Sequence, residues 1–402
     1  MEKKRQYRPK STRVQNHKYR KHQIWPWIVG LVVLAAVGAA IAYFTSVYFK
    51  TKNAVDKTYD PHTAVKTTGE FNGKKRFVVL LMGTDTGALD RTEKRGRTDT
   101  MILAVVNPAK KRYTLISIPR DTMAQMIGAD SFQTEKINAA YELGGAKMSM
   151  DSVSKLINVP IKYYAVVNMG GIMKMIRYVG GINIRPTLSF EYGGYIFKKG
   201  KLTHMGGAGA LAYSRMRYDD PRGDYGRQER QRQVITTLIK KAISVSSLSN
   251  LDSILTSVSS NVRTNLPFSA LQQIATNYRG CAKTSTSDYL HGYNAMIDDA
   301  AYQVQPTSEL QRISNKVRTE LGLEKETISN NETYQNKRNI AHGFSFKSGK
   351  TQDYHIYDYT GSTAEDTTGD DDNWWRLFMR HWSVISLVIF WLRWLSEKSF
   401  WK

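Results

Sequence analysis

A long uncharged segment directly behind a strongly basic N-terminus limits the architectures open to this chain. Residues 22–49 contain no Lys, Arg, Asp or Glu, and the part from Trp27 to Phe49 is almost wholly apolar. About 20 apolar residues are enough to cross a bilayer as a helix. Aromatic residues, which favour the membrane interface, lie near its ends: Trp25, Trp27, Tyr43 and Tyr48. We therefore expect one N-terminal transmembrane helix over residues 24–49.

The charges around this segment predict its orientation. Residues 1–23 carry many basic side chains against Glu2 alone: Lys3, Lys4, Arg5, Arg8, Lys10, Arg13, Lys18, Arg20 and Lys21. Basic flanks stay inside, so we expect residues 1–23 to be a cytoplasmic tail and everything after Lys50 to lie outside the cell. The alternative is a cleaved signal peptide, whose apolar core is shorter, ~7–15 residues, and precedes a small-residue cleavage site.

The single cysteine, Cys281, permits no internal disulfide, which favours a Gram-positive bacterium.

Alternating strand and helix patterns after a polar stalk, residues 50–76, predict an α/β domain over residues 77–240. Continuous apolar runs that end at turn residues predict strands at 77–82, 101–106 and 113–118, the last two forming a hairpin. Further on, helical patterns at 136–157 (broken at Gly144-Gly145), 170–178 and 231–242 alternate with strand patterns at 163–167 and 181–184. We therefore expect a sheet covered by helices on both faces.

The rest of the chain divides by composition. Leu and Ile recur at three- and four-residue spacing in residues 241–325, which predicts a helical C-terminal extension. Residues 326–373 are rich in Asn, Thr, Lys and Asp, which favours a loosely ordered polar tail. Residues 374–402 hold six tryptophans and are expected to lie in the membrane interface. The alternative for this last segment is a neutral tail with no selected role.

Three polar clusters adjoin the first three strands. Asp85 follows the first strand, Asp99 precedes the second, and Arg120-Asp121 follows the third. In an antiparallel sheet the end of one strand lies beside the start of the next, so Asp85, Asp99 and Arg120 are expected to meet at one edge. Two carboxylates together with phosphate oxygens are a common way to hold Mg²⁺. The alternative is that each acid only caps a turn.

An arginine-rich stretch at residues 213–233 indicates an anionic ligand. Its arginines are Arg215, Arg217, Arg222, Arg227, Arg230 and Arg232. Arginine binds phosphate in a bidentate manner and keeps its charge, so several in one pocket imply more than one phosphate. Arg215 and Arg217 share one side of an extended segment, whereas Arg227 and Gln231 share a helix face near a helix start that favours anions. The alternative is a solvated basic surface, and Arg222 and Arg232 in particular fit ordinary surface positions.

Several motifs together resemble the LytR-CpsA-Psr family. They are Arg97-Thr-Asp-Thr-Met-Ile-Leu, Ser117-Ile-Pro-Arg-Asp-Thr, Lys136-Ile-Asn-Ala-Ala-Tyr, Val179-Gly-Gly-Ile, Ala212-Tyr-Ser-Arg-Met-Arg and Gly226-Arg-Gln-Glu-Arg-Gln-Arg-Gln. The resemblance implies an α-β-α sandwich with an apolar pocket for a polyprenyl chain. It also implies a membrane-anchored phosphotransferase that moves a glycopolymer, such as teichoic acid or capsular polysaccharide, from undecaprenyl-pyrophosphate to peptidoglycan.

The resemblance also implies roles for individual residues. Pyrophosphate would be held by Arg120, Arg215, Arg217, Arg227 and Gln231, with Lys136 lining the same site. Asp85 and Asp99 would organise Mg²⁺, and Arg97 would stabilise charge nearby. Asp121 would either take the proton from the attacking hydroxyl or orient Arg120. Thr98 stands where the family usually has serine.

Three other functions are compatible with parts of the sequence. The net charge of +23 favours nucleic-acid binding by a transcription regulator, but the expected orientation places the arginine-rich domain outside the cell, so we expect no nucleic acid as partner. A phosphatase that uses water as acceptor of the same lipid pyrophosphate is a second alternative. A non-catalytic module that binds the lipid carrier is a third.

Overall fold

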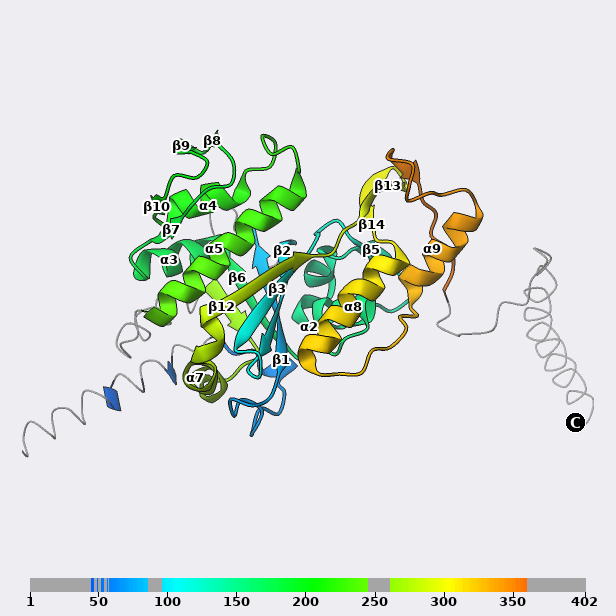
Figure 1. Cartoon of the computed structure of the whole chain (residues 1–402). Helices are drawn as coiled ribbons and strands as arrows, with labels where there is room; N and C mark the ends of the chain where they lie inside the picture. Colours follow the sequence, from blue (N-terminus) through cyan, green and yellow to red (C-terminus); the bar gives the residue numbers. More distant parts are fainter. Residues whose placement is uncertain are drawn as a thin grey trace, which may run out of the picture. The chain divides into compact units, whose positions relative to one another are not determined.

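The computed structural model describes residues 58–85, 96–244 and 261–359, with a few single positions between 45 and 56 (Figure 1). The described residues up to Asp358 belong to one compact unit. Almost all of the expected transmembrane helix at 24–49, and the whole of the tryptophan-rich segment at 374–402, lie outside these residues. Within the described parts no helix combines the length and the apolar character needed to span a bilayer.

A six-stranded mixed sheet forms the centre of the fold. Its strands, in spatial order, are β11 (Val262–Thr264), β6 (Tyr163–Asn168), β1 (Phe77–Thr84), β2 (Thr98–Asn107), β3 (Arg112–Ile118) and β12 (Thr284–Tyr289). The three strands β1, β2 and β3 are antiparallel, with Leu80 opposite Leu103 and Leu103 opposite Ile116. β6 runs parallel to β1, and β12 runs parallel to β3. The predicted strands and the β2–β3 hairpin are therefore confirmed.

Helices cover both faces of this sheet (Figure 1). On one face α2 (Ala139–Ile157) and α8 (Thr307–Leu321) pack on alternate strand residues such as Leu80, Met82 and Leu103. On the other face α5 (Asp224–Ser244) places Ile235 and Ile239 against Ile102 and Leu115. Neighbouring strand residues point to opposite faces, which explains why the central strands β1, β2 and β3 are largely apolar. The predicted mixed α/β class is confirmed.

Shorter elements surround the layers. α3 (Met169–Tyr178), α4 (Gly207–Arg215), the pair β7 (Ile182–Ile184) with β10 (Thr203–Met205), and the hairpin β8 (Phe190–Tyr192) with β9 (Tyr195–Phe197) build a second apolar cluster with α5. The short 3-10 helix η1 (Pro61–Thr63) precedes these elements in the chain. They are followed by helix α7 (Phe268–Asn277) and the 3-10 helix η3 (Arg279–Lys283). The hairpin β4 (Met123–Gln125) with β5 (Thr134–Lys136) follows β3. α2 has non-helical angles at Gly144 and Gly145, where the break was expected.

The described part of residues 241–325 is not the purely helical extension that was expected, although α7 and α8 are helices there. It contains β11 and β12, which are the two edge strands of the central sheet, and the hairpin β13 (Tyr293–Ile297) with β14 (Ala300–Val304). The sequence of β12 is Thr-Ser-Thr-Ser-Asp-Tyr, which has no apolar alternation. An edge strand that pairs through its backbone does not need such alternation, so the pattern gave no sign of it. The sheet therefore continues past residue 240.

The expectation of a loosely ordered tail from residue 326 is also wrong as far as residue 359. α9 (Asn331–Ala341) and β15 (Gln352–Asp353) are packed, and Asn331, Gln335 and Asn339 are buried. The amide of Gln335 donates to the carbonyl of Tyr357 and accepts from its N–H, and Asn339 makes the same pair of bonds with His355. The polar side chains that suggested disorder satisfy the backbone of a neighbouring extended segment.

Candidate functional site

A cavity of about 550 Å³ lies between the sheet and the helices α3, α4 and α5. Along α5 the residues that line it are first polar, Arg227 and Gln231, and then apolar: Val234, Ile235, Leu238 and Ile239. On the opposite side, Asp99, Thr100 and Arg120 lie near strand ends, whereas Leu81, Ala165 and Val167 lie within strands. The cavity therefore has a polar end and an apolar wall.

The polar end brings together residues that were predicted from strand order. Nη1 of Arg120 donates to Oδ1 of Asp99 at 2.6 Å, and Nε of Arg120 lies 3.5 Å from Oδ2 of Asp121. That Nε is buried and has no hydrogen-bond partner within the described chain. Burial alone would lower the pKa of Arg120, but the ion pair with Asp99, aided by Asp121 and Asp224, outweighs burial and raises the pKa. Arg120 thus stays fully charged at the cavity.

Three arginines of the 213–233 stretch line the same cavity. Arg215 ends α4, Arg217 follows it, and Arg227 lies in the first turns of α5. Arg227 pairs with Asp224 at 2.6 Å, whereas Arg215 and Arg217 form no ion pair among the residues the structure describes. Both are half-buried. Their charge therefore faces the cavity without an internal counter-ion, which favours an anionic ligand.

The other three arginines of the stretch support the structure. Arg230 is fully buried, pairs with Asp220 and donates to the carbonyls of Tyr213 and Met216. Arg222 is exposed and pairs with Asp220 and Glu229.

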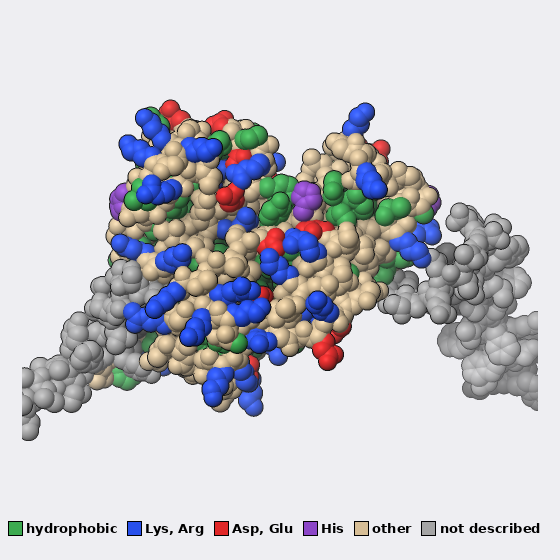
Figure 2. Space-filling view, viewed as in Figure 1, with side chains coloured by type: hydrophobic (Ala, Val, Ile, Leu, Met, Phe, Trp, Pro, Cys, Tyr) green, Lys and Arg blue, Asp and Glu red, His purple; other side chains and the backbone are tan. Residues whose placement is uncertain are grey.

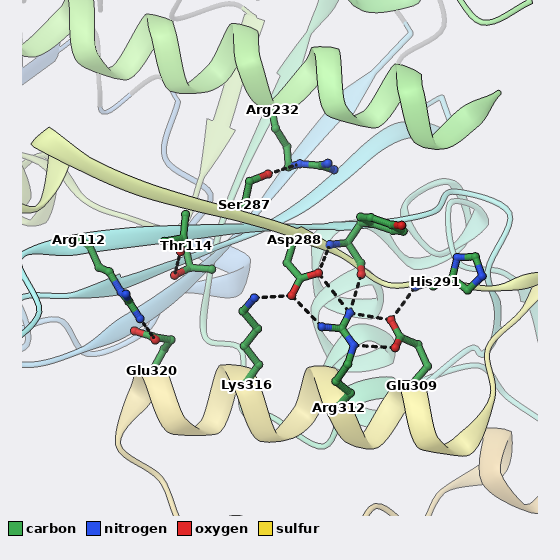
Figure 3. A network of polar contacts seen from close by, with 12 residues as sticks. Arg112, Thr114, Arg232, Ser287, Asp288, His291, Glu309, Arg312, Lys316 and Glu320 are labelled. Atoms are coloured by element: carbon green, nitrogen blue, oxygen red, sulfur yellow. Dashed lines mark hydrogen bonds and ion pairs between the residues drawn. The ribbon is translucent and has the colours of Figure 1, made fainter. Parts of the chain in front are cut away.

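Arg232 is not the surface residue that the sequence suggested, because it is only 6% exposed. Its Nε and Nη1 donate to the hydroxyls of Ser287 and Ser117, both at 2.6 Å, as Figure 3 shows for Ser287. Burial lowers its pKa. Arg232 therefore joins α5 to β12 and β3.

Other predicted residues do not line the cavity. Arg97 pairs with Glu142 at 2.9 Å on the surface. Lys136 lies 3.8 Å from Asp121 and 5.1 Å from the centre of the Tyr302 ring. Asp121 lies between Arg120 and Lys136, so its contacts fit the orienting role better than a direct contact with a ligand.

The carboxylates at the polar end are compatible with Mg²⁺. Asp99 lines the cavity, and Asp85 directly follows β1, whose last residue Thr84 also lines it. Within the described residues no group of three or more His, Cys, Asp or Glu side chains forms a metal cage. Mg²⁺ does not require one, because it keeps waters and takes substrate phosphate oxygens together with one or two carboxylates.

Some lining residues were not predicted. Tyr218, 90% exposed, stands at the cavity beside Arg217, and Asn168 caps α3 through its side chain. No local sequence pattern predicts that these two residues line the cavity, because their position depends on how α3 and α4 pack on α5. The apolar wall on α5 lies within the predicted helix at 231–242, where Val, Ile and Leu recur at three- and four-residue spacing, but only the family resemblance implied an apolar pocket.

The fold is an α/β sandwich whose cavity joins an apolar wall to an arginine-bearing end. The model of the LytR_cpsA_psr family matches residues 42–319, and the chain belongs to this family.

Named relatives and solved structures agree with this family. A protein of Enterococcus faecalis, polyisoprenyl-teichoic acid–peptidoglycan teichoic acid transferase TagU, is 40% identical over 300 residues, which are 74% of this chain and 97% of the relative. The crystal structure of Bacillus subtilis TagU is similar with 36% identity and a TM-score of 0.51, covering 64% of this chain and 100% of that one. Protein gbs0355 of Streptococcus agalactiae gives 31% identity and a TM-score of 0.63, covering 70% and 100%.

Proposed function

We propose that the chain is a membrane-anchored phosphotransferase that moves a glycopolymer of the teichoic acid type from a polyprenyl-pyrophosphate carrier to peptidoglycan. The observation that carries the proposal is the change of polarity along the cavity face of α5, from Arg227 and Gln231 to Leu238 and Ile239. A pyrophosphate joined to an isoprenoid chain has the same change along its length. The names of the relatives supply the polymer and the acceptor.

The reaction follows from this placement. An acceptor hydroxyl oxygen attacks the phosphorus atom that carries the glycopolymer. The bond from that phosphorus to the bridging oxygen breaks, and polyprenyl phosphate leaves along the apolar wall. The hydroxyl proton passes to a carboxylate at the polar end. Arg120, Arg215, Arg217 and Arg227 stabilise the charge that develops on the phosphate oxygens.

Two parts of the proposal concern the surroundings of the site. Asp99 and Asp85 would hold Mg²⁺, which would supply further neutralisation of phosphate charge. The domain would lie outside the cytoplasm of a Gram-positive bacterium, held by residues 24–49. Protease treatment of intact protoplasts tests this orientation, since the domain is cleaved only if it is external.

The direct test combines binding and turnover. Arg217→Ala should weaken binding of a polyprenyl-pyrophosphate glycolipid at least tenfold, since a charge-assisted bond to phosphate contributes about 1.5–3 kcal/mol. Arg177→Ala, an exposed position at the end of α3, is the matched control and should bind normally. Purified protein is then given the glycolipid with and without peptidoglycan oligomers. Release of free polymer to water with no transfer would instead favour a phosphatase, and binding without turnover would favour a lipid-binding module.

A further inference from the structure

A row of ring side chains runs from the last residue of β12 to the first residue of β13. Tyr289, His291 and Tyr293 alternate with Leu290 and Gly292, so in an extended segment they lie on one side. Leu290 and Gly292 are buried, whereas Tyr289 and Tyr293 are each 37% exposed. Ring centres lie 6.2 Å apart between Tyr289 and His291 and 5.1 Å between His291 and Tyr293. Phe346 extends the row, 5.5 Å beyond Tyr293.

The backbone beneath this ring row (Tyr289, His291, Tyr293 and Phe346) is held from several sides. Arg312 of α8 donates to the carbonyl of Tyr289, and Glu309 accepts from the N–H of His291 (Figure 3). The hydroxyl of Tyr225 bonds both the N–H and the carbonyl of Gly292. The rings are therefore presented by a fixed backbone, which lowers the conformational entropy lost on binding.

Tyr225 connects the ring row to the helix turn that carries the polar end of the cavity. Tyr225 lies 5.1 Å from the Tyr289 ring and 5.3 Å from His291, and it directly follows Asp224, the ion-pair partner of Arg227. Figure 2 shows hydrophobic side chains on either side of a histidine near the middle of one face of the molecule. A ligand that lies along the row therefore ends beside the arginines, while the cavity itself holds the phosphate carrier.

We propose that the ring row binds the sugar chain of the acceptor, a role that rests on the proposed function. Pyranose rings have flat C–H faces and polar edges. Aromatic rings with hydroxyl or nitrogen groups at their edges match both, and they give a large contact area with few rotatable bonds. A charged polymer would need Lys or Arg side chains in the row itself, and its members are Tyr, His, Tyr and Phe. The row places a glycan strand so that one hydroxyl reaches the phosphate end.

The experiment uses full-length protein in nanodiscs and glycan strands cleaved from peptidoglycan that has been freed of teichoic acid. Tyr293→Leu and Phe346→Leu keep apolar volume but remove the flat ring, and Tyr293→Phe keeps it. We expect each Leu variant to bind the glycan about fivefold more weakly, and Tyr293→Phe, which keeps the ring and loses only the hydroxyl, to lose less affinity than Tyr293→Leu. Tyr178→Ala, an exposed tyrosine on α3, is the matched control. In transfer assays the KM for the acceptor should rise while kcat and the KM for the lipid donor stay unchanged.

The outcomes separate this proposal from the proposed function. Normal transfer with unchanged glycan affinity and acceptor KM in both Leu variants overturns the ring row and leaves the transferase intact. Absence of transfer in the wild type overturns the proposed transferase function. The glycan-binding measurement still tests whether the ring row binds the glycan. Thermal unfolding at the wild-type temperature shows that a variant is folded.

Discussion

Arg230 and Asp220 form an ion pair in which both side chains are removed from solvent, with exposed fractions of 0% and 1%. The pair joins α5 to the segment after Met216, the segment that carries Arg217 and Tyr218 into the cavity. The position of the proposed phosphate ligands thus depends on an arginine that does not itself line the cavity.

Removing this arginine should destabilise the whole domain. In Arg230→Ala the carboxylate of Asp220 stays buried and loses its buried partner, keeping only the exposed Arg222, and loss of a buried partner costs about 3–5 kcal/mol in similar cases. Chemical denaturation measures the free energy of unfolding. Arg222→Ala, which removes an exposed partner of the same aspartate, should cost less than about 1 kcal/mol. Equal losses of unfolding free energy in the two variants would contradict the larger contribution of the buried arginine.

Gly226 is required by the same ion pair. A Cβ at this position would lie 1.9 Å from Oδ2 of Asp220, which Arg230 and Arg222 hold in place. Gly226→Ala should therefore cost roughly 1–3 kcal/mol, as other overpacked sites do, and should weaken glycolipid binding because α5 shifts. A Cβ on Gly280 meets nothing within 4 Å, so Gly280→Ala should unfold like the wild type.

The proposed Mg²⁺ ligand Asp99 can be tested by a nearly isosteric change. Asp99→Asn should keep the fold and greatly reduce transfer, because one negative oxygen donor is lost. Added Mg²⁺ should restore part of the rate if only affinity has changed. Rates are measured against Mg²⁺ concentration for the wild type, Asp99→Asn and the exposed control Asp130→Asn. Full wild-type activity in a chelator would leave arginine alone to neutralise the pyrophosphate.

Acid should weaken the contact between α8 and β12 (Figure 3). Burial alone would raise the pKa of Asp288, but hydrogen bonds from Arg312, Lys316 and the Tyr289 N–H hold it at about 2. Because the folded pKa is below the ordinary value of 3.8, the stabilisation is present above pH ~4 and is lost as the pH falls towards 2. Asp288→Asn should lower the free energy of unfolding by roughly 2 kcal/mol at pH 7. The difference from wild type should nearly vanish at pH 2.

Much of the central sheet could be predicted because its strands are continuous apolar runs between turn residues. The meeting of Asp99 and Arg120 followed from strand order alone, since both lie at strand ends of an antiparallel sheet. β12 and α9 could not be predicted in the same way. Their polar side chains bond to backbone and to residues far along the chain, as Asn339 does with His355, and such contacts leave no periodic pattern.

The arginine stretch shows the same limit within the candidate site. Arg217 and Arg230 are equally basic and lie close together in sequence, yet one lines the cavity and the other is buried in an ion pair. What separates their roles is the position of Asp220, and for Arg232 the position of Ser117 and Ser287. The sequence predicted that these arginines share one site, and three of them, Arg215, Arg217 and Arg227, do line the cavity, but it did not identify which arginines hold the scaffold.

The cavity face of α5 also sets a length scale for selection of the proposed carrier lipid. Ile239 follows Arg227 by twelve residues, which is about 18 Å along a helix axis. A ligand gains contacts with the protein only over that distance from its phosphates. Affinity should therefore rise with each added isoprene unit of a synthetic carrier until the apolar wall is covered, and then reach a plateau. Isoprene units farther from the phosphates would stay in the surrounding lipid and would not contact the enzyme.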